Sequence, residues 1–172
     1  MSALLARARQ QGSKDLVGFW VGDTYYAIDI HRVREVIRPL PTTALPDMPQ
    51  VVIGVAEFRR SVIPVIDLRR RFGTTSPVAS PKVRWIIVAD KGRPVALSVD
   101  AVTEVFGYQA TMARQVPDFL SSTQRKAVVS ACHYQDRLVF ILSIDDLVDV
   151  AADLDLSVVE APPGSHEKRG QP

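Results

Sequence analysis

The side chains that could attack a substrate or carry a proton are few and far apart in this sequence. Catalysis needs an activated nucleophile, or an acid–base pair, held at close range. The histidines are widely separated at His31, His133 and His166, and the one cysteine, Cys132, directly precedes His133. Neighbouring strand residues point to opposite faces, so we expect a buried structural cysteine beside an exposed histidine. The sequence therefore predicts no enzymatic activity.

Spacing also argues against a metal site or a bound cofactor. A zinc site needs several Cys or His ligands at short spacing, which one cysteine and separated histidines do not provide. The nine glycines are dispersed, and no glycine-rich phosphate loop follows a strand pattern. The acidic pairs Asp145-Asp146 and Asp153 with Asp155 have no partner motif and are typical of solvated helix ends. We expect no metal and no cofactor.

Arginine beside aromatic residues could indicate a small nucleic-acid-binding barrel, which combines a basic groove with exposed rings for base stacking. Residues 69–72 and Arg84-Trp85 supply both residue types. The net charge is only +2, however, and the aromatic residues mostly fall at strand positions where core packing is the default. Nucleic acid is not an expected partner, and an arginine-dependent nucleic-acid-binding barrel is kept as the alternative from a different class.

Protein recognition is the remaining chemistry, and one short segment favours it. Five consecutive residues between two apolar runs, 57–61, carry one carboxylate, one aromatic ring and two guanidinium groups. An exposed arginine beside an apolar rim has the composition of an interface anchor. We therefore interpret this turn as a contact surface for another protein.

Length and composition fit a globular chain with a core of its own. The 172 residues are 47% hydrophobic and 23% charged, which suits one compact unit or two small ones. No segment approaches the roughly 20 apolar residues of a membrane helix, so no direct membrane insertion is expected. The lone cysteine and the lack of an apolar leader in residues 1–14 favour a cytoplasmic location. We expect a flexible N-terminus over 1–15 and a disordered tail over 151–172.

Short strands separated by turn signals dominate the pattern between these ends. Pro64 lies inside one strand run and predicts an edge strand or a bulge there. Residues 31–38 fit either a short helical turn or a strand, residues 39–50 with four prolines predict a loop, and residues 145–149 a closing helical turn. The strand runs expected are 16–21 and 24–30, joined by a hairpin at Gly22-Asp23, then 51–55, 62–68, 85–89, 95–99 and 138–144.

The second half of the chain repeats the plan of the first. Residues 26–37 align with residues 95–106 at an offset of 69, and residues 62–68 align more weakly with residues 138–144 at an offset of 76. Two copies at so long a period indicate an internal duplication of one β-module, not a solenoid. The duplication predicts small barrels or a sandwich. It makes Val33 and Glu35 equivalent to Val102 and Glu104.

The motifs, taken in order, resemble the CheW family, the coupling proteins of bacterial chemosensory arrays. The run from Pro64 to Arg69, Pro-Val-Ile-Asp-Leu-Arg, is the most specific of them. The resemblance implies an all-β fold of two SH3-like five-stranded barrels in a domain over 16–150, with subdomains at about 16–75 and 82–148 that exchange strands. The segments that carry it are 19–30, 33–36, 54–55, 62–72, 99–105 and 137–142.

By this resemblance the protein is a non-enzymatic adaptor. Its partners would be the regulatory domain of a CheA-type histidine kinase and the cytoplasmic hairpin tip of chemoreceptors, with recruitment to membrane-associated receptor arrays. The region between the barrels would bind partners, and Arg59 matches the arginine of the family's Asn-Leu-Arg-Gly motif, associated with receptor coupling. The protein-binding residues expected are Val33, Glu35, Val36, Glu57, Phe58, Arg59, Arg60, Val102 and Glu104.

The chain departs from the family pattern in that motif. Glu57-Phe58-Arg59-Arg60 stands where the family has Asn-Leu-Arg-Gly, and the glycine often supplies a positive φ that arginine adopts only with strain. Either the turn has another shape, or its altered surface suits another partner. The alternative within the same fold is therefore a divergent paralogue that binds only one of the two partners as a modulator.

Overall fold

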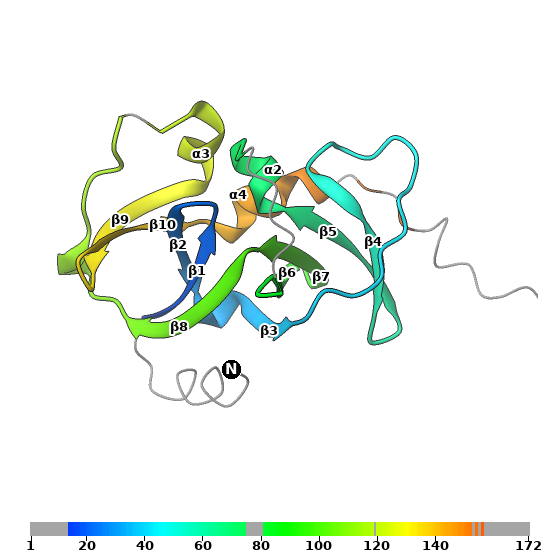
Figure 1. Ribbon diagram of the computed structural model, residues 1–172, viewed down its shortest axis with the longest axis horizontal. Helices are drawn as coiled ribbons and strands as arrows, with labels where there is room; N and C mark the ends of the chain where they lie inside the picture. The colour runs from blue at the N-terminus through cyan, green and yellow to red at the C-terminus, as the bar shows by residue number, and fades with distance from the viewer. Residues whose placement is uncertain (1–13, 75–80, 119, 153, 155, 157–172) are drawn as a thin grey trace, which may run out of the picture.

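The computed structural model describes residues 14–74, 81–118, 120–152, 154 and 156, and within them the chain forms ten strands and several short helices. The strands make two SH3-like barrels of five strands each, side by side in Figure 1. The predicted fold class is confirmed. The strands are β1 (Asp15–Val21), β2 (Thr24–Asp29), β3 (Val33–Ile37), β4 (Val52–Phe58), β5 (Ser61–Asp67), β6 (Arg84–Asp90), β7 (Arg93–Val99), β8 (Ala101–Gly107), β9 (Val128–Tyr134) and β10 (Arg137–Leu142).

Each barrel takes strands from both copies of the duplicated module. The first barrel has the order β8-β1-β2-β10-β9, and the second has the order β3-β6-β7-β5-β4. The first two strands of each copy thus pair with the last three strands of the other copy. A parallel pair occupies the same place in each barrel, β2 with β10 and β7 with β5, among otherwise antiparallel neighbours. The subdomain limits 16–75 and 82–148 stay a prediction, since each barrel includes strands from both ranges.

Most helices and strands form where the local sequence predicts them. The hairpin at Gly22-Asp23 joins β1 to β2, and Gly22 has a φ of 59° that suits the tight turn. Residues 31–38, which the sequence left open, contain both alternatives: His31 and Arg32 end the 3-10 turn η1 (Ile30–Arg32), and the strand β3 follows from Val33.

The interpretation of Pro64 as a sign of an edge strand is wrong, and the bulge in the β4–β5 ladder lies between Val52 and Gly54 and not at Pro64. Strand β5 lies between β7 and β4 in the interior of the sheet, and Pro64 faces Val55 in its antiparallel pairing with β4. The parallel ladder to β7 begins one residue later, at Val65. The missing N–H of Pro64 therefore falls outside that ladder, so the strand tolerates it.

One short helix follows the last strand of each copy, and these two equivalent helices lie between the barrels (Figure 1). Helix α2 (Leu68–Phe72) begins at Asp67, whose side chain accepts the N–H of Arg69 at 2.8 Å, and ends at Gly73 with a φ of 69°. Helix α4 (Ile144–Val148), followed by η3 (Asp149–Ala151), matches the predicted helical turn. The structure adds η2 (Ala110–Met112) and α3 (Ser122–Ala127), which begins with a capping box between Ser121 and Gln124.

The described residues bury three hydrophobic clusters. One fills the first barrel around Tyr25 and Phe106, and another fills the second barrel around Trp85 and Ile63. The largest lies between the barrels and includes residues of α2, α3 and α4. The central cluster and the helices hold the two barrels together, because apolar burial is the main favourable term in folding.

A polar bridge links the barrels beside this central cluster. The carboxylate of Asp100, just after β7, accepts the N–H of Gly22 at 2.6 Å and pairs with Arg69 of α2. Both side chains of the ion pair are mostly buried, at 16% and 15% exposed. The pairing raises the pKa of Arg69, chiefly through its hydrogen bond to Asp100.

Candidate protein-binding site

The turn predicted at 57–61 is a two-residue loop between paired strands. Glu57 and Phe58 end β4, Ser61 begins β5, and Arg59 and Arg60 form the loop. Both arginines have positive φ, 49° and 67°, a combination that two-residue hairpins usually give to Asn or Gly. Each non-glycine residue held there costs about 1–2 kcal/mol. The strain foreseen for an arginine in this motif is therefore present, and such strain often marks functional turns.

The second barrel brings Arg59 to Glu35, 24 residues away in sequence. Arg59 Nη2 donates to Glu35 Oε2 at 2.6 Å, and the guanidinium carbon lies 5.3 Å from the centre of the Phe58 ring. The Arg59 side chain is 73% exposed and the Glu35 side chain 34%. This pair therefore presents an oriented guanidinium group to solvent and does little for stability, because exposed ion pairs contribute little.

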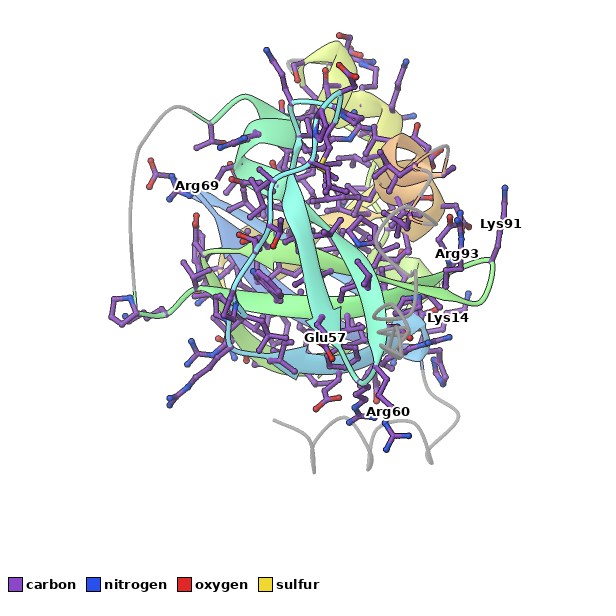
Figure 2. All side chains as sticks on the ribbon, turned by 90° about the vertical axis from the view of Figure 1, so that its right-hand side faces the viewer. Lys14, Glu57, Arg60, Arg69, Lys91 and Arg93 are labelled. Atoms are coloured by element: carbon purple, nitrogen blue, oxygen red, sulfur yellow. The ribbon has the colours of Figure 1, made fainter. Side chains whose placement is uncertain are left out.

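We call Glu35, Glu57, Phe58, Arg59 and Arg60 the hairpin surface. Phe58 is half-buried and packs against the core of the second barrel, while Glu57 and Arg60 are exposed. Figure 2 shows Arg60 at the tip of the β4–β5 hairpin with Glu57 nearby. A rigid aromatic ring beside guanidinium and carboxylate groups can bind a protein surface that offers an apolar side chain and a carboxylate.

The valines predicted at the site lie beneath the surface or at its margin. Val33 is fully buried in the central cluster, so its side chain cannot touch a partner in this conformation. Val36 is half-buried against the same cluster. The pairing of β3 with β6 shifts register between Val33 and Glu35, and such a bulge re-aims the side chains that follow it. Val33 thus anchors the strand that presents Glu35.

The equivalent glutamate of the first barrel, Glu104, has a different environment. Its carboxylate accepts the hydroxyl of Tyr134 at 3.1 Å and lies 4.0 Å from Nη1 of Arg137. Burial, and then this hydrogen bond, raises the pKa of Tyr134. Val102 is half-buried against the central cluster. Glu104 and Val102 therefore belong to the first barrel and not to the hairpin surface.

Tyr134 and Arg137, which surround Glu104, were not among the site residues predicted from the sequence. Arg137 lies 4.9 Å from the ring centre of Tyr25 and 5.7 Å from that of Trp20. The offset of 76 that relates the last strands of the two copies would have paired Tyr134 with Phe58. That alignment was the available signal for an aromatic residue beside each glutamate.

The residues considered for catalysis and metal binding are placed as the strand pattern predicts. Cys132 is fully buried while His133 is exposed, and burial raises the pKa of the Cys132 thiol, which disfavours the reactive thiolate. No three His, Cys, Asp or Glu side chains gather to hold a metal ion in the described part of the chain. His166, Asp153, Asp155 and most of both predicted tails lie outside the described residues.

The rings considered for nucleic-acid stacking are buried. Phe72 is 7% exposed and Trp85 2%, so neither can stack on a base. Of the arginines beside Phe72, Arg69 pairs with Asp100, and Arg71 Nη2 donates to Asp149 at 3.2 Å. The alternative of a nucleic-acid-binding barrel therefore loses the exposed rings that base stacking needs.

None of the helices formed by the described residues has the length and hydropathy needed to cross a membrane.

Comparisons with known proteins agree on one family. The family model described as a CheW-like domain matches residues 15–152. The chemotaxis protein CheW of Rhizobium meliloti is 30% identical over 144 residues, which cover 83% of this chain and 92% of that protein. The CheW of Helicobacter pylori is 29% identical over 146 residues, covering 83% and 88%.

A solved structure agrees with these sequences. The crystal structure of the scaffolding protein TtCheW from Thermoanaerobacter tengcongensis superposes with a TM-score of 0.71 at 31% identity, covering 78% of this chain and 87% of that one. The match of sequence, strand arrangement and domain length shows that this chain belongs to the CheW-like domain family.

Proposed function

We propose that this protein is a non-enzymatic adaptor that couples a CheA-type histidine kinase to chemoreceptors. Membership of the family supports a chemotaxis scaffold or adaptor role. The observation that carries the finer proposal is the hairpin surface, where Arg59 is oriented by Glu35 and Phe58 but remains largely exposed. In the cell the protein would be cytoplasmic, without inserting into the membrane itself, and recruited to receptor arrays through these partners.

The geometry of Arg59 suits a binding anchor. A guanidinium already held by a carboxylate and a ring loses less side-chain freedom on binding, which lowers the entropic cost of association. Its planar fork can still offer hydrogen-bond donors to a carboxylate of the partner. We assign the hairpin surface to the receptor hairpin tip, since Arg59 aligns with the family's receptor-coupling arginine. The kinase regulatory domain would bind elsewhere on the scaffold.

A second candidate function is a modulator that binds only one of these partners. The hairpin surface favours it, because Glu57 replaces an amide by a carboxylate and Arg60 adds a guanidinium at a position with a φ of 67°. Added charges of both signs change which partner surfaces are complementary.

Binding measured against each partner separately tests the proposal. The purified protein is mixed in turn with a CheA regulatory domain and with a receptor signalling fragment, and affinity is measured by titration. Adaptor function requires both to bind. Binding to one alone identifies the modulator, and binding to neither excludes a bridging role.

Variants then locate the receptor contact. Arg59→Asn removes the guanidinium while tolerating a positive φ, and should weaken receptor binding at least tenfold with an unchanged melting curve, as expected of a hot-spot arginine. Gln135→Asn is the matched control, because Gln135 is exposed and holds the equivalent turn position with a φ of 47°. An unchanged affinity together with a lowered melting temperature would assign Arg59 to structure instead.

A further inference from the structure

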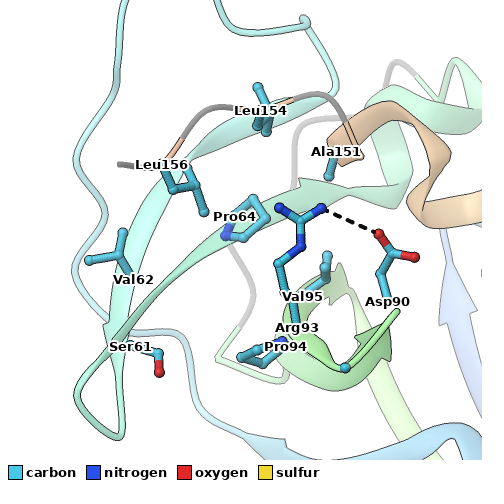
Figure 3. Close-up of a pocket in the computed structure, with 11 residues that line it drawn as sticks. Ser61, Val62, Pro64, Asp90, Arg93, Pro94, Val95, Ala151, Leu154 and Leu156 are labelled. Carbon is cyan, nitrogen blue, oxygen red and sulfur yellow. Dashed lines mark ion pairs between the residues drawn. The ribbon is translucent and has the colours of Figure 1, made fainter. Parts of the chain in front are cut away.

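A cavity of about 350 Å³ lies in the second barrel where β5 and β7 diverge. The ladder between these strands begins only part of the way along each of them, so their first residues are not joined to each other. Val62, Pro64 and Val95 give the cavity apolar walls. Asp90 and Arg93, an ion pair drawn as a dashed line in Figure 3, line it at the β6–β7 turn. Apolar walls with a few polar groups are typical of small-ligand sites, which begin at about 300 Å³.

The duplication shows that this combination belongs to the second barrel. At the offset of 69, the first barrel has neutral residues at the three equivalent positions, which are Val21 for Asp90, Thr24 for Arg93 and Tyr26 for Val95. Tyr26 forms an aromatic cluster with Phe72 and Phe140 inside the central cluster, at ring distances of 4.8 and 6.0 Å. The second barrel therefore has an open space and two charges where the first has a ring and neutral side chains.

The carboxylate of Asp90 lines this cavity with an unmet need for hydrogen-bond donors. Its side chain is only 10% exposed, and Nη2 of Arg93 lies 3.9 Å from it, beyond hydrogen-bond range. Arg32 also interacts electrostatically with Asp90, but its guanidinium group donates to both oxygens of Asp145, at 2.6 and 3.1 Å. A buried carboxylate without donors costs free energy, and an ammonium group in the cavity would supply them.

Arg93 offers the opposite charge beside Asp90. Its Nη2 donates to the carbonyl of Ala152 at 3.2 Å, and the side chain is 55% exposed. A guanidinium group has several N–H donors in one plane, so it can bind a ligand carboxylate in addition to this carbonyl. Lys91, exposed on the same turn and near Arg93 in Figure 2, also attracts a carboxylate to this end of the cavity.

We propose that the cavity binds a free α-amino acid with a branched aliphatic side chain. The ammonium group of the ligand lies against Asp90 and its carboxylate against Arg93, while its side chain packs on Val62, Pro64 and Val95. The two charges of an α-amino acid are joined through a single carbon atom, which suits two side-chain charges 3.9 Å apart. A ligand with one charge would be attracted by one residue of the pair and repelled by the other.

Titration of the full chain with L-leucine tests the site, followed by NMR of the methyl groups of Val62 and Val95. Their shifts should saturate at millimolar concentrations. Asp90→Asn should weaken binding about tenfold, as expected when a charged hydrogen bond is lost. Asp136→Asn is the control and should leave the affinity unchanged, because Asp136 is an exposed carboxylate on the β9–β10 turn of the first barrel. Absence of saturable shifts, or equal affinities of the wild type and Asp90→Asn, would overturn the proposal.

Ligand analogues and a cavity-filling variant provide independent measurements. Isocaproic acid lacks the ammonium group of leucine and isoamylamine lacks its carboxylate, so each should bind at least about tenfold more weakly than L-leucine. Val62→Phe, at a half-buried position on the cavity wall, should block L-leucine while the rest of the spectrum stays folded. An analogue that binds as tightly as L-leucine, or unchanged binding to Val62→Phe, would contradict the proposed site. These readouts are independent of kinase or receptor binding.

Discussion

The two barrels are built from one repeated module, yet each pairs its equivalent glutamate with an arginine from a different position of the module. In the first barrel Arg137 is 35% exposed and lies over the rings of Tyr25 and Trp20. In the second barrel Arg59 is 73% exposed on a strained turn. Each arginine faces the equivalent glutamate of its own barrel. The difference indicates that the arginine of the first barrel packs against its own barrel, while the arginine of the second barrel is presented to solvent.

The same contrast appears inside the barrels. Gly18 of the first barrel leaves room for the Tyr25 side chain, whereas its equivalent in the second barrel is Ile87. Beside the central cluster, Tyr26 of the first barrel stacks on Phe72, whereas its equivalent in the second barrel, Val95, borders a cavity of about 350 Å³. A duplicated fold can thus keep one barrel tightly packed and leave the other with surfaces and space for binding.

The aromatic cluster should give the largest difference between the barrels. Phe140→Ala is expected to lower the free energy of unfolding by about 3–5 kcal/mol, because it leaves a void in a filled core. Pro64→Ala at the equivalent position should cost no more than about 1 kcal/mol, since Pro64 already borders open space. Urea denaturation measures both, and equal costs would contradict the contrast in packing.

Gly18 offers a test within the first barrel. A Cβ at this position would overlap the Tyr25 hydroxyl, which shares a 2.6 Å hydrogen bond with Thr103. Gly18→Ala should therefore cost about 1–3 kcal/mol of stability, as overpacking usually does. Gly107→Ala is the control on the same sheet, because its added Cβ makes only ordinary contact with Asp15. A Gly18 variant as stable as the control would show that Tyr25 moves freely.

Removing each arginine in turn should show which one stabilises the fold and which one is only presented to solvent. Arg137→Ala is expected to lower stability by about 1–2 kcal/mol, through lost cation–π contacts and lost packing of the side-chain stem. Arg59→Ala should change it by less than about 1 kcal/mol, because its ion pair is exposed. Thermal and urea unfolding of both variants measures this. The reverse order of costs would remove the distinction between the barrels.

Alkaline pH should give the smallest difference. The pKa of Tyr134 is raised by burial and by its hydrogen bond to Glu104, whereas the equivalent Phe58 does not titrate. A raised pKa means that the stabilising contribution is complete below the ordinary tyrosine range and is lost as pH rises through the folded value. Stability should fall more steeply above about pH 10 in the wild type than in Tyr134→Phe. Parallel pH profiles would contradict this role.

Much of the fold could be predicted from local pattern. Alternating apolar residues located seven of the ten strands, while β3 was left open and β8 and β9 were not predicted; the offsets of 69 and 76 revealed the duplicated module. The capping residues Asp67 and Ser143 begin equivalent helices, of which only α4 was predicted from the sequence. Pro64 misled the prediction because its effect depends on where the neighbouring ladder begins.

The candidate site was predicted only in part. Residues Glu35, Phe58 and Arg59 were all singled out from the sequence, but their meeting was not, because they are joined by the closure of the second barrel. The burial of Val33 and the partners of Glu104 also depend on strands far apart in the chain.

By itself, the sequence determined most of the strands, the duplication and the family resemblance, because these depend on residue type and spacing along one chain. Only the tertiary structure decided which strands share a barrel, which arginine is presented and where a cavity remains. Those outcomes follow from side-chain volume and strand pairing between distant segments, and both copies of the module carry the same local pattern.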